Sequence, residues 1–167
     1  YDGMEQIKSD TLIDTHGAYV IAPRNVAKQL NVPFVDATRI THDIETGMGI
    51  EGSRKLHMWF MPGENPQVPK GKKDNTHYNV YGARVVAGAL ADAVAEQVPA
   101  LKSHVCHYDY VVSAEGRGNF MDLQKAVDAV PVGKKAVIRI WGGEWKKPII
   151  AKDKKIKFVK SFGAKIK

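Results

Sequence analysis

Cysteine is nearly missing from this sequence: Cys106 is the single one among 167 residues. One thiol cannot form a disulfide within the chain, and it has no second cysteine with which to build a metal site, so a buried or merely tolerated thiol is expected. The histidines offer no metal frame either, because only His104 and His107 lie close together and no third ligand accompanies them. We therefore expect no metal ion and no cofactor.

Long apolar runs are lacking as well. No stretch approaches the roughly eighteen residues that a membrane-spanning helix needs, so we expect no membrane partner. The opening residues, YDGMEQIKSD, contain neither a basic start followed by an apolar stretch nor a small-residue cleavage site. A secretory signal is therefore not visible in them. The hydrophobic content of 44% and the charged content of 26% are ordinary for a globular protein.

Charge is distributed unevenly along the chain. Residues 1–105 hold 11 Lys and Arg against 12 Asp and Glu, a net charge of −1. Residues 106–167 hold 14 against 6, a net charge of +8. Such asymmetry indicates two segments of different origin, and the basic one can attract a polyanion. Nucleic acid and acidic polysaccharide are both candidates at this point.

The first segment is typical of the end of an α/β domain. Its patterns predict a helix over 23–30, then a short buried strand over 33–37 that would belong to a parallel sheet. Residues 37–75 are interrupted by many glycines and prolines, which predicts a long loop with a short helix near 38–46. Apolar residues at helical spacing then predict a long helix over 79–98.

The second segment begins afresh after a short linker. A strand near 108–113 and a glycine turn at 116–118 are followed by a helix near 120–130. Three further short strands are expected, at 136–141, 146–151 and 155–160. The lysines near the end of the chain alternate with Ile156 and Phe158, so one face of that strand would be basic. Solvated lysines are the simpler interpretation of this alternation, and core or edge packing is the simpler one for the tryptophans.

One short motif carries chemistry. KKDNTHYNVYGA, residues 72–83, places Asp74 and His77 just ahead of the long helix. Ester hydrolysis at neutral pH needs a nucleophile whose proton is taken by an imidazole, with a carboxylate holding that imidazole in the right tautomer. An Asp and a His three residues apart in a turn can meet side by side. The alternative is that Asp74, Asn75, Thr76 or Asn79 simply caps the helix.

Three stretches carry a resemblance: DTHGAYVIAPRNVAKQLNVPFVDAT, SRKLHMWFMPGENP and KKDNTHYNVYGARVVAGALADAV. Together they resemble the last part of rhamnogalacturonan acetylesterase-like members of the SGNH, or GDSL, hydrolases. The resemblance implies that Asp74 orients the imidazole and that His77 is the general base. It also implies that the Gly-Asp-Ser block with the nucleophile and the residues of the oxyanion hole lie upstream of this chain. None of the five serines is preceded by Gly-Asp: Ser9, Ser53, Ser103, Ser113 and Ser161.

The second segment has a different relative. YDYVVSAEGRGNFMDLQKAVDAVP, followed by AVIRIWGGEWKKPIIAKDKKIKFV, resembles the opening of pectin methylesterases. The fold implied is the end of a three-layer, flavodoxin-like α/β SGNH domain in residues 1–104, then the start of a right-handed parallel β-helix in 105–167. No active-site residue of the second domain falls within this chain.

Two functional hypotheses follow. The resemblances imply a serine-type carbohydrate esterase that removes acetyl and methyl esters from pectic polysaccharide. Such an enzyme would be secreted or periplasmic, would bind no nucleic acid, and would be inactive as this chain alone. The alternative is a non-catalytic basic module that binds acidic polysaccharide or nucleic acid.

Overall fold

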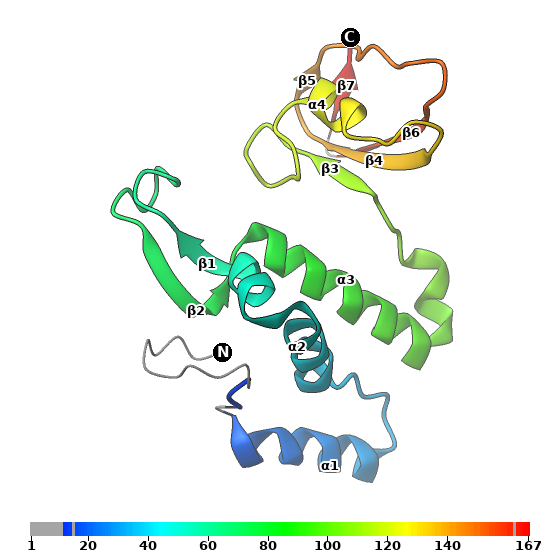
Figure 1. Cartoon of the computed structure of the whole chain (residues 1–167). Helices are drawn as coiled ribbons and strands as arrows, with labels where there is room; N and C mark the ends of the chain where they lie inside the picture. Colours follow the sequence, from blue (N-terminus) through cyan, green and yellow to red (C-terminus); the bar gives the residue numbers. More distant parts are fainter. Residues whose placement is uncertain (1–11, 15, 162) are drawn as a thin grey trace. The chain divides into compact units, whose positions relative to one another are not determined.

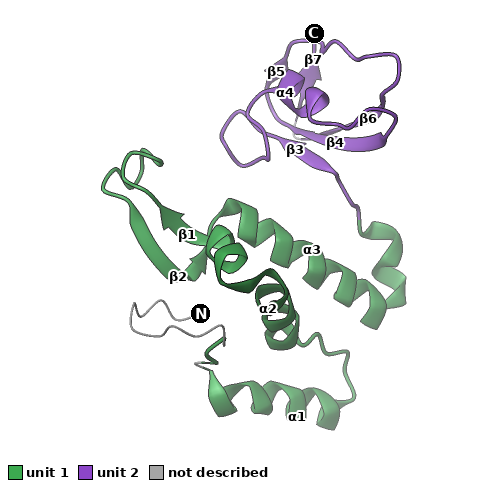
Figure 2. Cartoon of the chain, viewed as in Figure 1, with its two compact units in different colours: residues 1–105 green, residues 106–167 purple. Residues whose placement is uncertain are grey.

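The computed structural model describes residues 12–14, 16–161 and 163–167, and it is mixed α/β (Figure 1). The chain divides into two compact units, Tyr1–Val105 and Cys106–Lys167 (Figure 2). No helix in the described part of the chain is both long enough and apolar enough to cross a bilayer. Cys106 is exposed, so of the two alternatives expected for this thiol, buried or merely tolerated, the buried one is wrong.

In its described residues, unit 1 consists mainly of helices with one pair of strands. Its elements in order are η1 (Gly17–Val20), α1 (Ile21–Leu30), α2 (Ala37–Leu56), β1 (His57–Phe60), β2 (Lys72–Tyr78), α3 (Val80–Gln97) and η2 (Pro99–His104). The predicted helices over 23–30 and 79–98 correspond to α1 and α3. Pro23 lies in the first turn of α1, where its missing N–H costs no hydrogen bond.

The strand expected over 33–37 is absent. Residues 32–36 have no regular secondary structure and pair with no strand, and Ala37 already belongs to α2. Asp36 explains the difference: its carboxylate accepts a hydrogen bond from the backbone N–H of Arg39 and so caps the helix. The same carboxylate forms a 2.8 Å ion pair with Arg24 of α1. The position predicted to end a strand therefore begins a helix.

The long loop expected over 37–75 is confirmed only at 61–71, and the short helix expected near 38–46 is part of a longer one. Residues 37–56 form α2, and the chain continues directly into β1. The glycines in this stretch predicted a loop, but α2 contains them and bends at one of them. Gly49 has φ of 66° and ψ of −179°, and helical backbone resumes after it. Only glycine adopts this conformation readily. Beyond β1, residues 61–71 are turns that lead to β2.

The strands of unit 1 form an antiparallel pair, β1–β2, at the junction of α2 and α3. Leu56, the last residue of α2, is fully buried there. Gly82 in the first turn of α3 lies so close that an added Cβ atom would overlap the carbonyl oxygen of Leu56. A larger residue would separate the two helices, so this contact fixes where α3 begins relative to β1.

Unit 2 contains two small sheets and one short helix. Its elements are β3 (Tyr110–Val112), α4 (Leu123–Asp128), β4 (Lys135–Trp141), β5 (Glu144–Trp145), β6 (Lys155–Ser161) and β7 (Lys165–Ile166). All strand pairs are parallel, in the orders β3-β4-β6 and β5-β7. The chain thus visits the two sheets in turn. The parallel pairing lies in this unit, and the three-layer arrangement implied for residues 1–104 stays a prediction.

The core of unit 2 is small and apolar. Alternate residues of β4 point inward, and α4 covers them with Leu123, Ala126 and Val127. Trp145 is buried in the same cluster, as expected for a packing role. The strand predicted at 146–151 is not formed, because the backbone N–H of Ile149 donates to the side chain of Gln124 instead of to a neighbouring strand.

Candidate active site

Asp74 and His77 lie on β2, not in the turn that the sequence predicted. Pairing with β1 is irregular here: Tyr78 is opposite His57 and Asp74 is opposite Met58, so residues 75–77 have no partner on β1. These three residues form a bulge. One Asp74 carboxylate oxygen accepts hydrogen bonds of 2.9 Å from the backbone N–H groups of Thr76 and His77. The bulge therefore folds around the carboxylate.

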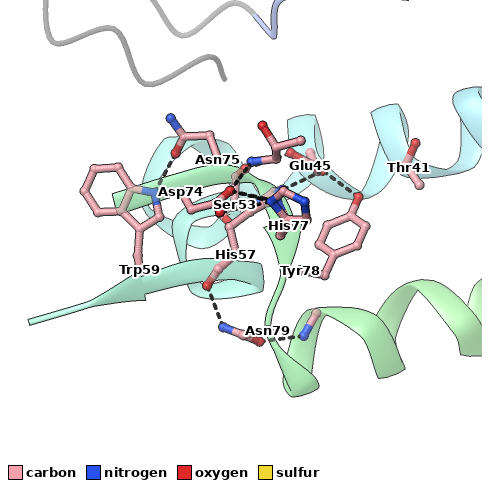
Figure 3. Close-up of polar contacts among 12 residues, drawn as sticks. Thr41, Glu45, Ser53, His57, Trp59, Asp74, Asn75, His77, Tyr78 and Asn79 are labelled. Atoms are coloured by element: carbon pink, nitrogen blue, oxygen red, sulfur yellow. Dashed lines mark hydrogen bonds and ion pairs between the residues drawn. The ribbon is translucent and has the colours of Figure 1, made fainter. Parts of the chain in front are cut away.

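The two side chains meet, as Figure 3 shows. His77 Nδ1 lies 3.0 Å from Asp74 Oδ2 and 3.2 Å from Oδ1. Lys72 Nζ is 2.9 Å from the same Oδ2. The Asp74 side chain is only 14% exposed, whereas that of His77 is 71% exposed. The pair thus has a sheltered acid and an accessible ring.

Electrostatics define the protonation of this pair. The backbone N–H of His77, the Lys72 ammonium and the backbone N–H of Thr76 hold the pKa of Asp74 far below its usual range. An ionised carboxylate can only accept hydrogen bonds, so the proton between the side chains belongs to His77 Nδ1. In the neutral ring this leaves Nε2 with a lone pair, which is the state that a general base needs.

This ionisation is testable in the chain itself. Asp74 should remain ionised below about pH 4, where an ordinary aspartate takes up a proton. Because its pKa is lower in the folded state, Asp74 contributes stability above that pH and loses this contribution as the pH falls through the folded pKa. The carboxyl ¹³C shift of Asp74 followed against pH measures this. Lys72→Gln should raise the pKa of Asp74, whereas Lys70→Gln should not; equal effects would contradict the assignment.

Trp59 of β1 supports the bulge from one side. Its indole N–H donates to the side-chain oxygen of Asn75, the first bulge residue. The Arg54 guanidinium stacks over the indole ring at 4.5 Å from its centroid, and Lys73 Nζ lies at 5.8 Å. The ring therefore contacts two cations, and its N–H holds the side chain of Asn75.

A buried polar network supports the bulge from the other side. Tyr78 follows His77 directly, and its hydroxyl donates to Glu45 Oε1 of α2 at 2.8 Å. Ser53 donates to the other carboxylate oxygen, also at 2.8 Å, and His57 Nδ1 bonds the Ser53 carbonyl oxygen. Burial, followed by the neighbouring Glu45, raises the pKa of Tyr78 above its usual range. The network ties the end of β2 to α2.

Removing the Tyr78 hydroxyl tests this support. Tyr78→Phe deprives a buried carboxylate of one of its donors, so the free energy of unfolding of unit 1 should fall by about 1–3 kcal/mol. Denaturant unfolding followed by circular dichroism measures the change. Tyr81→Phe is the matched control, because that side chain is 48% exposed. An equal effect of both substitutions would mean that the Glu45 contact does not hold β2 in place.

Asn79 completes the frame after the bulge. Its side-chain amide donates to the carbonyl oxygens of Lys55 and His57, and its side-chain oxygen accepts from the backbone N–H of Gly82. Of the four possible caps that the sequence offered, Asn79 is thus the one that caps α3. Asp74 does not cap the helix and instead bonds Thr76, His77 and Lys72.

The His77 ring borders an open hollow of about 1150 Å³. Residues of β2 and of α2 line it, the latter including Thr41 and Glu45, which Figure 3 labels. His16 and Arg24 line another part of it. The hollow can admit a further group to Nε2 of His77.

No serine hydroxyl bonds His77 in the described residues. Ser53 Oγ donates to Glu45, and Ser161 Oγ donates to the carbonyl oxygen of Ile140 in unit 2. Ser113 is buried in unit 2, and Ser9 lies outside the described residues. Among the residues described, no three His, Cys, Asp or Glu side chains gather as metal ligands, His104 and His107 included.

The sequence anticipated the Asp74 and His77 pairing but missed its surroundings. Glu45, His57 and Tyr78 are far apart in sequence, and no spacing connects them. Comparison with known proteins adds one finding. A stretch of 103 residues is 38% identical to the rhamnogalacturonan acetylesterase RhgT of Bacillus subtilis (strain 168).

This similarity covers 62% of the chain but only 42% of the relative, so the chain spans less than half of that protein's length. A match of 103 residues is longer than unit 2, so it must extend into unit 1. It supports an SGNH esterase-like part in the chain. No family model matches the sequence, and no solved structure matches it.

Proposed function

We propose that unit 1 supplies the histidine and the aspartate of a serine-type carbohydrate esterase that removes acetyl groups from rhamnogalacturonan. The observation that carries the proposal is the 3.0 Å contact between His77 Nδ1 and Asp74 Oδ2, with the ring open to a hollow. The similarity to RhgT, named as a rhamnogalacturonan acetylesterase, supplies the substrate class.

The chemistry assigns one task to each residue. His77 Nε2 takes the proton of a serine hydroxyl as its oxygen bonds the acetyl carbon. The carbonyl carbon becomes tetrahedral, and its collapse releases the sugar hydroxyl, which receives that proton from His77. His77 then takes a proton from water, whose oxygen bonds the acetyl carbon of the acetyl-serine; the new tetrahedral intermediate collapses to acetic acid, and the serine oxygen leaves with the proton that His77 returns to it. Asp74 keeps the proton on Nδ1 and stabilises the imidazolium that forms in both steps.

The nucleophile belongs, in this proposal, to a segment beyond these 167 residues. No serine of the chain follows Gly-Asp. Unit 1 also exposes large apolar side chains around α1 that a further part of the domain would cover: Tyr19, Ile21, Val26, Leu30 and Val32. RhgT is longer than the aligned stretch by more than half of its length, which leaves room for such a part.

Unit 2 is proposed to begin a right-handed parallel β-helix of the pectin methylesterase kind. Support comes from its pairing: β4 and β6 run parallel in unbroken register from Lys135 opposite Lys155 to Trp141 opposite Ser161. β5 pairs with β7 in the same parallel sense. Repeated return to the same sheet is how stacked coils form. Methyl-ester removal would need catalytic residues that this chain does not contain. The same proposal includes export of the protein from the cell, because its pectic substrate lies outside the cell.

A chimera tests the esterase proposal. In the chimera, residues 12–105 of this chain would replace the aligned segment of RhgT. The rest of RhgT would be kept. The chimera should release acetate from acetylated rhamnogalacturonan, and the 167-residue chain alone should not exceed background. A folded but inactive chimera would contradict the proposal. Turnover by the chain alone, abolished by His77→Ala, would place the nucleophile inside it and contradict the missing-serine assignment.

A further inference from the structure

We propose that the outward face of the β3-β4-β6 sheet in unit 2 is a binding surface for an acidic polysaccharide, a polymer of uronic acid. The proposal rests on the proposed function for its substrate class. Four side chains define this face, which we call the basic face: Lys135, Arg139, Lys155 and Lys157.

Strand geometry places these cations together. Along β4, the residues Ala136, Ile138 and Ile140 are buried, so the positions between them point outward. The register sets Lys135 opposite Lys155, about 4.8 Å away across neighbouring strands. Lys157 is the next outward residue of β6 and lies opposite Val137. Three ammonium groups therefore gather at one end of the sheet.

The acidic groups near these three lysines carry less negative charge than the lysines carry positive charge. None of them forms an ion pair among the residues that the structure describes, whereas Lys167 pairs with Glu144 in the same unit. They border a hollow of about 480 Å³ whose one acidic lining residue is Asp109. That carboxylate already accepts a 2.7 Å hydrogen bond from the backbone N–H of Val137. Like charges opposite one another on a sheet are unfavourable unless an anion is bound.

The other end of the basic face presents a positioned guanidinium. Arg139 lies 5.1 Å from the ring centroid of Tyr108 and 5.6 Å from that of Trp141. Its Nε donates to Ser161 Oγ at 3.3 Å. A guanidinium oriented in this way offers its remaining N–H groups to a planar carboxylate, which it can bind with two hydrogen bonds.

The arrangement favours a uronate polymer over nucleic acid. Cations follow the strand direction on the outward face of the sheet, which suits an extended chain that carries a carboxylate on each sugar. Single-stranded nucleic acid is held by stacking of bases on aromatic rings. The rings of Tyr108 and Trp141 are instead engaged by Arg139. Aromatic stacking of bases is thus not the interaction that this surface offers.

Binding of the whole 167-residue chain to polygalacturonate, measured by isothermal titration calorimetry at several salt concentrations, tests the inference. Affinity should fall steadily as salt rises. Binding of the lysines releases the small cations that surround the polymer, and this release favours binding less when the salt concentration is high. The double variant Lys155→Gln with Lys157→Gln should bind about tenfold or more weakly. The matched control, Lys146→Gln with Lys147→Gln, removes the same charge from exposed positions after β5 and should bind like the parent chain.

Three results would overturn the inference. They are absence of binding to polygalacturonate, equal losses in the two double variants, and binding to duplex or single-stranded DNA as tight as to polygalacturonate. Fully methyl-esterified pectin should not bind, because it lacks free carboxylates. The chimera with RhgT contains no unit 2, so acetate release and polygalacturonate binding can fail separately. Failure of one does not imply failure of the other.

Discussion

In the chimera, His77→Ala should lower kcat for acetate release by a factor on the order of 10⁴ or more, because the serine loses the group that takes its proton. The KM for the polysaccharide should change little, since the ring contacts the reacting hydroxyl and not the body of the sugar. Folding should be unaffected, because the side chain is largely exposed and its bonding partner among the described residues is Asp74. Steady-state kinetics with a circular dichroism spectrum measure both.

Two further variants make that result specific. Asp74→Asn should also reduce kcat strongly, because an amide can donate to Nδ1 and so favour the wrong tautomer. His104→Ala changes another imidazole, in η2, outside the hollow and should leave kcat unchanged. If the chimera kept its kcat after His77→Ala, His77 would not be the general base, whatever effect Asp74→Asn had.

Gly82→Ala should destabilise unit 1 by roughly 1–3 kcal/mol, the range seen when a packed interior must take an extra methyl group. The added Cβ would meet the backbone of Leu56, which cannot swing aside as a side chain can. Either α3 shifts or the hydrogen bond that the Gly82 N–H donates to the Asn79 side-chain oxygen weakens. Thermal unfolding of the chain, followed at two wavelengths, should show the loss.

Gly88 of the same helix provides the control. A Cβ there meets no atom within 4 Å, so Gly88→Ala should stabilise α3 by about 0.5–1 kcal/mol through helix propensity alone. The two substitutions add the same methyl group and differ only in what it meets. Effects of the same sign would show that the approach of α3 to Leu56 is looser than the structure has it.

Local patterns predicted much of the secondary structure. The helix over 79–98 and the strands at 136–141 and 155–160 are found as α3, β4 and β6, because apolar periodicity depends only on neighbouring residues. The strand at 33–37 failed for the opposite reason. A strand needs a partner, and the capping carboxylate of Asp36 offered the backbone a local alternative. The loop predicted around Gly49 failed for a similar reason, since a kinked helix and a loop can have the same amino-acid composition.

The candidate site divides in the same way. Asp74 and His77 are three residues apart in the sequence, and this spacing is enough to predict that they can meet. The sequence did not reveal the bulge that brings them together, because a bulge depends on the register between β1 and β2. Nor could it connect Glu45 with Tyr78, which are 33 residues apart, or Trp59 with Asn75, which are 16 apart.

The amino-acid sequence by itself therefore determined which groups are present: an Asp and a His at a workable spacing, a helix start after them, a basic second segment, and no serine after Gly-Asp. Tertiary structure alone decided how they are used. It made Asp74 sheltered and His77 accessible, gathered three lysines on one face, and assigned the cap to Asn79. The physical reason is that chemical identity and periodicity are local properties, whereas burial, hydrogen-bond partners and charge neighbours depend on segments that meet only after folding.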